Sequence, residues 1–176
     1  RDTEVLARKT KGTLLRKETR GGYLVLVSSK STDELASKPI EVVLADEIDR
    51  YVKSAQKEGS PIALAEARTK TFWNRKIILA STPTIKGESA IEKEYHQSSM
   101  EEWCVPCPSC GEYQPFSWEM LDFESAKMTC NYCGCMHLEA EWKSGEAKWI
   151  ERIDNKKVKG FHLGEMGSTW RTWKNL

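Results

Sequence analysis

The sequence predicts an α/β fold with a parallel sheet, followed by a small cysteine-rich β unit. Short runs of β-branched and aliphatic residues are separated by segments with helical spacing, which is typical of parallel strands joined by crossover helices. Two copies of the pattern Cys-x-x-Cys-Gly lie in the second half of the chain. Near Cys104, prolines, cysteines and aromatic residues replace the alternation of strands and helices. The composition therefore changes where the second unit is expected.

The composition is that of a folded protein. The chain has 176 residues, of which 39% are hydrophobic, and its seven Trp, five Tyr and four Phe supply large packing groups. The longest apolar runs are strand-sized, so the sequence predicts no membrane span, and we see no signal peptide. Six cysteines without an export signal favour metal binding in a reducing compartment over disulfides.

Positive charge is concentrated at the start of the chain, although the net charge is only +1. Such a cluster can face nucleic acid, or it can be an ordinary solvated surface, which is the commoner case. The basic residues among the first twenty positions are Arg1, Arg8, Lys9, Lys11, Arg16, Lys17 and Arg20.

The elements of the first region follow from local signals. Tyr23–Val27 is expected to be a buried strand because aromatic and β-branched residues dominate it. The next strand, 40–45, is almost continuously apolar, which suits a parallel sheet covered on both faces. A short helix between them can be capped by Ser31 or Thr32 and is stopped by Pro39. We also expect a third strand at 75–80 and helices at 61–73 and 88–97.

The repeated pattern Cys-x-x-Cys-Gly predicts a structural zinc site. Two intervening residues let both sulfur atoms of a pair turn toward one ion, and the following glycine permits the positive φ that points backbone N–H groups at the thiolates. Four protein ligands leave no open position for water, so the site is expected to stabilise a small fold and not to catalyse. Phe116, Trp118 and Phe123 are the expected local packing. The expected ligands are Cys107, Cys110, Cys130 and Cys133.

Three neighbouring residues leave the choice of ligands open. Cys104 also forms a Cys-x-x-Cys pair with Cys107, and Cys135 and His137 follow the second pair closely. The trailing glycines favour the assignment above, with Cys104 and Cys135 as free, partly buried thiols.

The strand predicted at 40–45 ends in two adjacent carboxylates, Asp46 and Glu47, which is the form of a Walker B element. At the carboxyl end of a parallel strand, Asp46 can hold Mg²⁺ directly or through water, and Glu47 can orient or deprotonate the attacking water. Acidic pairs are also common as solvated turn residues, so this motif alone is weak.

A hydroxyl-rich turn, Ser81-Thr82-Pro83-Thr84, follows the next predicted strand. Hydroxyl groups there can hydrogen-bond the water or the carboxylate and respond to the γ-phosphate. A capped turn with φ set by Pro83 is the alternative. The sequence contains no G-x-x-x-x-G-K-[ST] phosphate loop, so we expect the phosphate cradle to lie upstream of this segment.

In order along the chain, the motifs GGYLVLV, SKPIEVVLADEIDRY, ASTPT, CVPCPSCGEYQ and GFHLGEM resemble lambda-type terminase large subunits of tailed phages. The family often has Asn where this chain has Gly164, and His162 in the same motif is given no chemical role. The resemblance implies part of a P-loop NTPase parallel sheet with a small four-cysteine zinc-ribbon β unit. It divides the chain into the second half of an ATPase core (1–100), the zinc ribbon (101–140) and a connection toward a nuclease domain (141–176).

The resemblance also implies an ATPase that uses ATP, Mg²⁺ and Zn²⁺. Asp46 would be the magnesium-binding carboxylate, Glu47 the catalytic glutamate, and Ser81, Thr82 and Pro83 the coupling motif. The expected partners are double-stranded viral DNA, the terminase small subunit, the portal protein and further copies in a ring, in the host bacterial cytoplasm. The full-length protein would also be an endonuclease, and the segment alone is expected to be inactive.

Two other functions remain open at this point. A non-catalytic zinc-ribbon module that binds nucleic acid or protein would need only the ribbon and a suitable surface. A superfamily 2 helicase fragment would share the acidic pair and the hydroxyl motif, but a ribbon directly after them argues against it.

Overall fold

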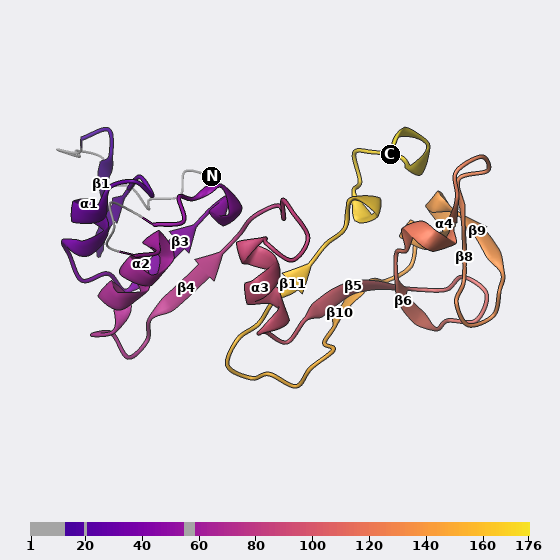
Figure 1. The fold of residues 1–176 in the computed structure, drawn as a ribbon. Coiled ribbons are helices and arrows are strands. Elements are labelled where there is room, and N and C mark those ends of the chain that lie inside the picture. Colours follow the sequence, from indigo (N-terminus) through magenta and orange to yellow (C-terminus); the bar gives the residue numbers. More distant parts are fainter. Residues whose placement is uncertain (1–12, 20, 55–58) are drawn as a thin grey trace. The chain divides into compact units, whose positions relative to one another are not determined.

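A computed structural model describes residues 13–19, 21–54 and 59–176 (Figure 1). The chain divides into two compact units, residues 1–84 and 85–176. The functional division into 1–100, 101–140 and 141–176 stays a prediction. Most of the N-terminal basic cluster lies outside the described residues. No helix among the described residues is long and apolar enough to cross a membrane.

The first unit opens with an antiparallel hairpin of β1 (Arg16–Thr19) and β2 (Gly22–Val25). The strand predicted at 23–27 is therefore present in part, but the prediction that it is buried was wrong. Tyr23 is 41% exposed and Leu24 is 49% exposed. The reason is its pairing, because β2 bonds to β1 and not to the parallel strands that follow. The Arg16 guanidinium covers the Tyr23 ring at 4.4 Å from its centroid.

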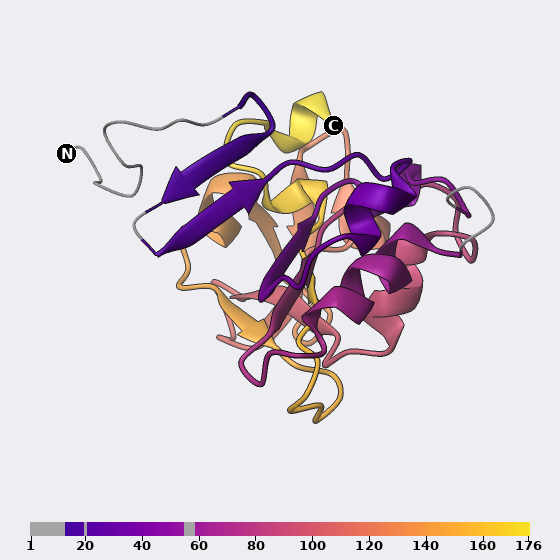
Figure 2. The same ribbon diagram turned by 90° about the vertical axis from the view of Figure 1, so that its left-hand side faces the viewer.

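The centre of the first unit is a parallel pair, β3 (Val42–Ala45) and β4 (Lys76–Leu79). Ala45 lies opposite Leu79, so the two strands end at the same edge. Helices α1 (Thr32–Ala36) and α2 (Pro61–Thr69) lie side by side next to this pair, as Figure 2 shows. The parallel strands and the crossover helix expected from the sequence are confirmed.

Complete coverage of this sheet is not confirmed. Val42 and Leu44, which share one face of β3, are 43% and 66% exposed, and Ile78 of β4 is 54% exposed. Side chains of a strand alternate between its faces, and the described helices of the unit leave these positions open.

The second unit begins with α3 (Ala90–His96), capped by the Ser89 hydroxyl, which accepts the Glu92 N–H at 3.1 Å. Strand β5 (Glu101–Pro106) is the centre of a mixed sheet. It pairs with β10 (Lys148–Ile150) and β6 (Tyr113–Pro115) antiparallel, and with β11 (Phe161–His162) parallel.

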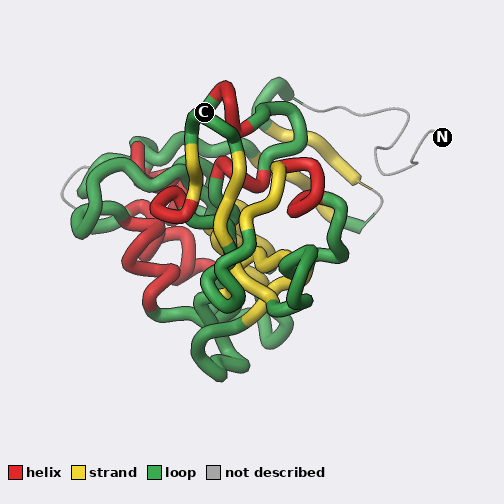
Figure 3. Tube along the Cα trace, turned by 90° about the vertical axis from the view of Figure 1, so that its right-hand side faces the viewer, coloured by secondary structure: helices red, strands yellow, loops and turns green. Residues whose placement is uncertain are grey.

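A second antiparallel sheet contains β7 (Leu121–Asp122), β8 (Lys127–Thr129) and β9 (Met136–Leu138). Helix α4 (Glu139–Lys143) follows β9 directly. The strands of this unit are short and are joined by long loops, as the tube in Figure 3 shows. Single 3-10 turns occur at Ile48–Arg50, Trp118–Met120, Glu165–Gly167 and Trp173–Asn175.

Two tryptophans close the core of the second unit. Trp142 is fully buried and Trp173 is 1% exposed. Their indole N–H groups donate to the carbonyl oxygens of Met128 at 3.0 Å and Met166 at 2.9 Å. Burial of each indole therefore leaves no N–H unpaired, which makes both rings strong packing groups.

This core differs from the packing predicted for the ribbon. Phe116 packs against the core, but Trp118 and Phe123 are 46% and 57% exposed. Trp142 and Trp173, which lie outside the span 101–140, fill the core positions that were expected for Trp118 and Phe123. Sequence spacing could not reveal this, because the residues meet only through tertiary contacts.

Candidate functional site

Two matching turns bring four cysteines together in the second unit. In the first turn, the Gly111 N–H donates to the Cys107 carbonyl at 2.9 Å; in the second, the Gly134 N–H donates to the Cys130 carbonyl at 3.0 Å. Gly111 has φ of +77° and Gly134 has φ of +72°, the left-handed conformation that glycine permits. Both glycines therefore have the positive φ that the sequence predicted for them.

The sulfur atoms of Cys107, Cys110, Cys130 and Cys133 all lie within 4.8 Å of one another. The distances Cys107 Sγ to Cys133 Sγ and Cys110 Sγ to Cys130 Sγ are both 3.8 Å. Tetrahedral Zn²⁺ with bonds of about 2.3 Å to sulfur requires sulfur atoms about 3.8 Å apart. The donor set and its spacing therefore fit a tetrahedral metal ion.

Backbone groups support negative charge in the cluster. The N–H groups of Ser109 and Tyr132 each point at a sulfur, of Cys107 and Cys130 respectively, at 3.4 Å. Burial opposes ionisation of Cys107, but backbone N–H groups of Cys110 and Ser109 and the neighbouring thiols outweigh it and lower its pKa to about 6. One thiolate is therefore stable in the cluster at neutral pH.

The pKa values of Cys110 and Cys133 are raised, so these two thiols ionise less easily. The backbone N–H of Cys135 favours the Cys133 thiolate, but burial and hydrogen bonds to the neighbouring thiols prevail and raise the pKa of Cys133 to about 12. A divalent cation would supply the charge that allows four thiolates to coexist.

Side chains from two different strands hold the two cysteine turns. Gln114 of β6 is 2% exposed, and its Oε1 accepts the backbone N–H of Asn131 in the second turn at 2.9 Å. Its Nε2 has no hydrogen-bond partner among the described residues. His137 of β9 reaches the first turn, where its Nε2 lies 2.8 Å from Ser109 Oγ. Each turn is thus held by a side chain from a strand of the other sheet.

Cys104, Cys135 and His137, the other possible ligands, lie outside the group of four sulfur atoms. Cys104 is 3% exposed and lies in β5, and burial raises the pKa of its thiol. It is the buried thiol that the sequence suggested, whereas Cys135 is exposed. Neither belongs to the four-sulfur group, and His137 contacts Ser109.

In the first unit, the acidic pair and the hydroxyl turn lie at one edge of the β3–β4 pair. The Ala80 N–H donates to the Ala45 carbonyl at 2.9 Å, which continues the pairing to the ends of the strands. Asp46 and Glu47 follow β3 directly and are exposed. Parallel strands present their carboxyl ends at one edge, where ligands of α/β sheets bind.

Glu47 has a left-handed backbone, with φ of 53° and ψ of 43°. This conformation costs free energy for any residue other than glycine, and residues that adopt it are common at functional sites. Two contacts hold it. Its N–H donates to Asp46 Oδ1 at 2.9 Å, and its carboxylate lies 3.5 Å from Arg50 Nε. The following residue, Ile48, is 2% exposed and anchors the turn.

Asp49 connects the two motifs, a role that the sequence reasoning missed. Its N–H donates to Ser81 Oγ at 3.2 Å, and its Oδ2 accepts the backbone N–H of Thr84 at 2.9 Å. Thr84 Oγ1 also donates to this oxygen at 3.2 Å. Thr82 and Pro83 follow β4 in the same turn and are exposed. The available signal was a third acidic residue two positions after Glu47.

Tyr51 lies near the same edge. Burial and then the negative charge of Asp46 raise the pKa of Tyr51 above its ordinary value. The phenol of Tyr51 therefore stays protonated and neutral beside the Asp46 carboxylate.

Comparisons with known proteins identify a family and two relatives. The family described as phage terminase large subunit gpA, ATPase domain, matches residues 2–149. The terminase large subunit of Enterobacteria phage P21 is 35% identical over 125 residues, which cover 64% of this chain and 20% of that protein. The terminase large subunit of Escherichia phage lambda is 26% identical over 148 residues, covering 77% and 23%.

The matched segment spans about a fifth of the length of these curated relatives. No solved structure matches the chain significantly. The residues that the family model matches include both the acidic strand end and the cysteine turns. The chain belongs to the gpA family of phage terminase large subunits, within the ATPase domain.

Proposed function

We propose that this segment is part of an ATP-driven motor that moves double-stranded viral DNA, and that its first unit is part of a P-loop NTPase sheet. The observation that carries the proposal is the shared edge of β3 and β4, where a hydrogen bond joins Asp49 to Ser81 at 3.2 Å. This edge brings carboxylates and hydroxyl groups together at the place where α/β sheets bind ligands.

The proposed roles follow from position. Asp46, directly after β3, would hold Mg²⁺ directly or through a water molecule. Bound Mg²⁺ would supply positive charge that offsets the negative charge of the ATP phosphates. Glu47 would orient the attacking water and accept its proton, so that the water oxygen displaces ADP from the γ-phosphorus in line. Ser81, Thr82 and Pro83 would form the coupling motif.

We also propose that Cys107, Cys110, Cys130 and Cys133 hold a structural zinc ion. Support comes from sulfur distances of 3.8 Å and from the matched turns. The zinc would link β5 and β6 to the β7–β9 sheet and so complete the fold of the second unit.

The wider assignments are part of the same proposal and rest on the family. The partners would be viral DNA, the terminase small subunit, the portal protein and further copies in a ring, in the host bacterial cytoplasm. An endonuclease activity would belong to the longer protein. The family match favours this function over a helicase fragment or a purely non-catalytic module.

The test is ATP turnover by the longer protein that contains this segment and a phosphate loop. Glu47→Gln should lower kcat at least about 100-fold while leaving ATP binding within about 3-fold, because it removes the base and keeps the shape. Glu88→Gln, at an exposed residue of the second unit, is the control and should change neither value. Equal loss of binding and turnover in Glu47→Gln would refute the catalytic role.

A further inference from the structure

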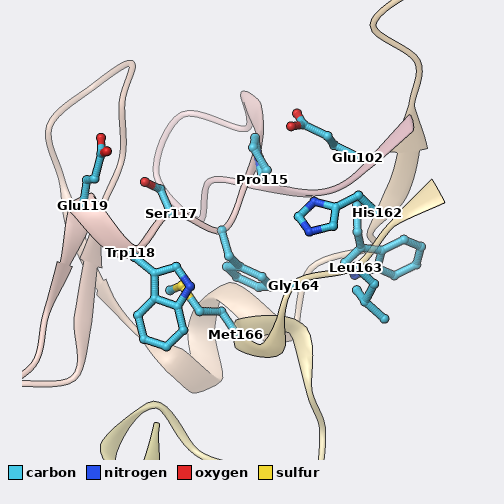
Figure 4. A pocket seen from close by; sticks show the side chains of 11 residues that line it. Glu102, Pro115, Ser117, Trp118, Glu119, His162, Leu163, Gly164 and Met166 are labelled. Carbon is cyan, nitrogen blue, oxygen red and sulfur yellow. The ribbon is translucent and has the colours of Figure 1, made fainter. Parts of the chain in front are cut away.

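The second unit has a pocket that neither ATP hydrolysis nor zinc binding uses. Its volume is about 370 Å³, and its apolar lining includes Phe116, Trp118 and Met166. Figure 4 shows Trp118 and Met166 on one side of the pocket and His162 and Glu102 on the other. All the lining residues belong to the second unit, so the pocket does not depend on how the two units are arranged.

An exposed indole forms one wall. Trp118 is 46% exposed although it stacks on Phe123, with ring centroids 5.9 Å apart and an interplanar angle of 19°. Stacking fixes the ring without burying it. A large aromatic ring that is held in place and left open to solvent is a common feature of binding surfaces.

The segment that supplies Pro115 to Glu119 of the pocket lining is acidic. Residues 104–138 contain four acidic side chains and one basic side chain, Lys127. All four acidic side chains are exposed, and none forms an ion pair with a described residue. A zinc ion held by four thiolates would add negative charge. The acidic residues are Glu112, Glu119, Asp122 and Glu124.

The charge argues against DNA as the occupant of this surface. DNA is bound through lysine and arginine side chains that neutralise phosphates, and an acidic face repels it. Of the two carboxylates that line the pocket, Glu102 already pairs with Arg152. Glu119 therefore remains available for an incoming cation.

The same unit already holds cations in this way. Lys143 Nζ lies 5.8 Å from the centroid of the Trp173 ring and 2.6 Å from Glu139 Oε1. Lys148 Nζ lies 3.6 Å from the centroid of the Tyr113 ring. An aromatic ring together with a carboxylate thus binds a lysine inside this fold. Trp118 and Glu119 both line the pocket, but their side chains point in different directions, so each offers a separate contact to an incoming segment (Figure 4).

We propose that this pocket is a docking site for a basic, extended segment of a partner protein, with one arginine or lysine side chain inserted. The methylene groups would lie on Phe116 and Met166, and the cation would lie against Trp118. A neighbouring basic residue of the segment would pair with Glu119. The surrounding acidic residues would attract the rest of the segment and speed its association.

The experiment uses the zinc-loaded chain and the peptide acetyl-Gly-Arg-Gly-Arg-Gly-Arg-Gly-amide. Its titration is followed by NMR of the indole N–H signals, with that of Trp118 assigned from Trp118→Phe. Matched probes are the same peptide with citrulline in place of arginine and a 20-base-pair DNA duplex. We expect the arginine peptide to shift the Trp118 signal, with affinity that falls as salt rises, and the other two probes to leave it unchanged.

Variants locate the binding site. Trp118→Ala and Glu119→Gln should each weaken binding about 3-fold to 5-fold, the size expected for an exposed cation–π contact or a surface ion pair. Trp170→Ala and Glu146→Gln, at exposed residues outside the pocket, should leave it unchanged. Zinc content and thermal unfolding identify any variant that fails to fold.

Three results would overturn the proposal. Equal binding of the citrulline peptide would show an apolar site without charge selection. A shift of the Trp118 signal by the DNA duplex would identify a nucleic-acid surface instead. Absence of binding by the arginine peptide at low salt would show that the pocket has no such ligand.

Discussion

The carboxylate of Asp49 accepts two hydrogen bonds from Thr84, one from the backbone N–H at 2.9 Å and one from Oγ1 at 3.2 Å. These bonds tie the end of the hydroxyl turn to the acidic turn after β3. A movement at either turn is therefore passed to the other through one side chain. The two motifs form a connected unit in which Asp49 has the central place.

Asp49→Ala should loosen this connection. Loss of two hydrogen bonds to a charged acceptor should make amide exchange at Thr84 about 30-fold faster, because the two bonds together are worth about 2 kcal/mol. Hydrogen exchange followed by NMR or mass spectrometry measures this effect. Asp154→Ala, at an exposed residue of the second unit, is the control. Unchanged exchange at Thr84 would mean that the contact adds no local stability.

The segment by itself should not turn over ATP. Its sequence contains no phosphate loop, and positioning of the phosphates is the main part of phosphoryl-transfer catalysis. A coupled assay of ADP release with purified chain, ATP and Mg²⁺ should give the background rate. Addition of the preceding segment of the longer protein should restore turnover. Rapid Mg²⁺-dependent ATP turnover by the segment alone would contradict the prediction that catalysis needs a phosphate loop from another segment.

Zinc removal should unfold much of the second unit. The cysteine cluster adjoins the core that contains Cys107, Cys130, Trp142 and Trp173, so loss of the ion would separate the two sheets. Metal analysis should give one zinc per chain and four thiols protected from alkylation, and chelation should abolish the near-ultraviolet circular dichroism of the buried indoles. An unchanged indole signal after complete removal would show that the fold does not need the metal.

Zinc binding should weaken as the pH falls. Burial and the neighbouring thiols raise the pKa of Cys133 to about 12, and the pKa of Cys110 is also raised, so both are protonated at neutral pH without metal. Each must lose its proton when the ion binds, so roughly two or more protons should be released per zinc. Calorimetry in buffers of different ionisation enthalpy counts them. A pH-independent affinity between pH 6 and about 8 would contradict thiolate ligation.

Gln114→Met should reduce zinc affinity about 10-fold, the lower end of the range for residues that support metal ligands. Methionine has a side chain of similar size, but it lacks the amide oxygen that accepts the Asn131 N–H. This hydrogen bond holds the second cysteine turn. Competition with a chromophoric chelator measures the affinity. Gln97→Met, at an exposed residue, is the control. Equal zinc affinities of the unaltered chain, Gln114→Met and Gln97→Met would show that Gln114 contributes only to packing.

Local signals determined much of this fold. The glycines after each cysteine pair required a positive φ, and Gly111 and Gly134 have it. Continuous apolar runs predicted the parallel pair β3 and β4, because burial and backbone pairing act on a few adjacent residues. The helix expected at 61–73 is present as α2, which begins at Pro61, where the fixed φ of proline suits the first helical turn, and ends at Thr69.

Tertiary structure decided what adjacent residues cannot encode. No local signal indicated that β2 would pair with β1 and stay exposed, or that Asp49 would contact Thr84 across 35 positions. It also suggested Trp118 as core, although Trp142 and Trp173 fill that place and leave Trp118 at the surface. Spacing fixes the chemistry of a motif, whereas competition among distant side chains for one limited core volume decides which of them are buried.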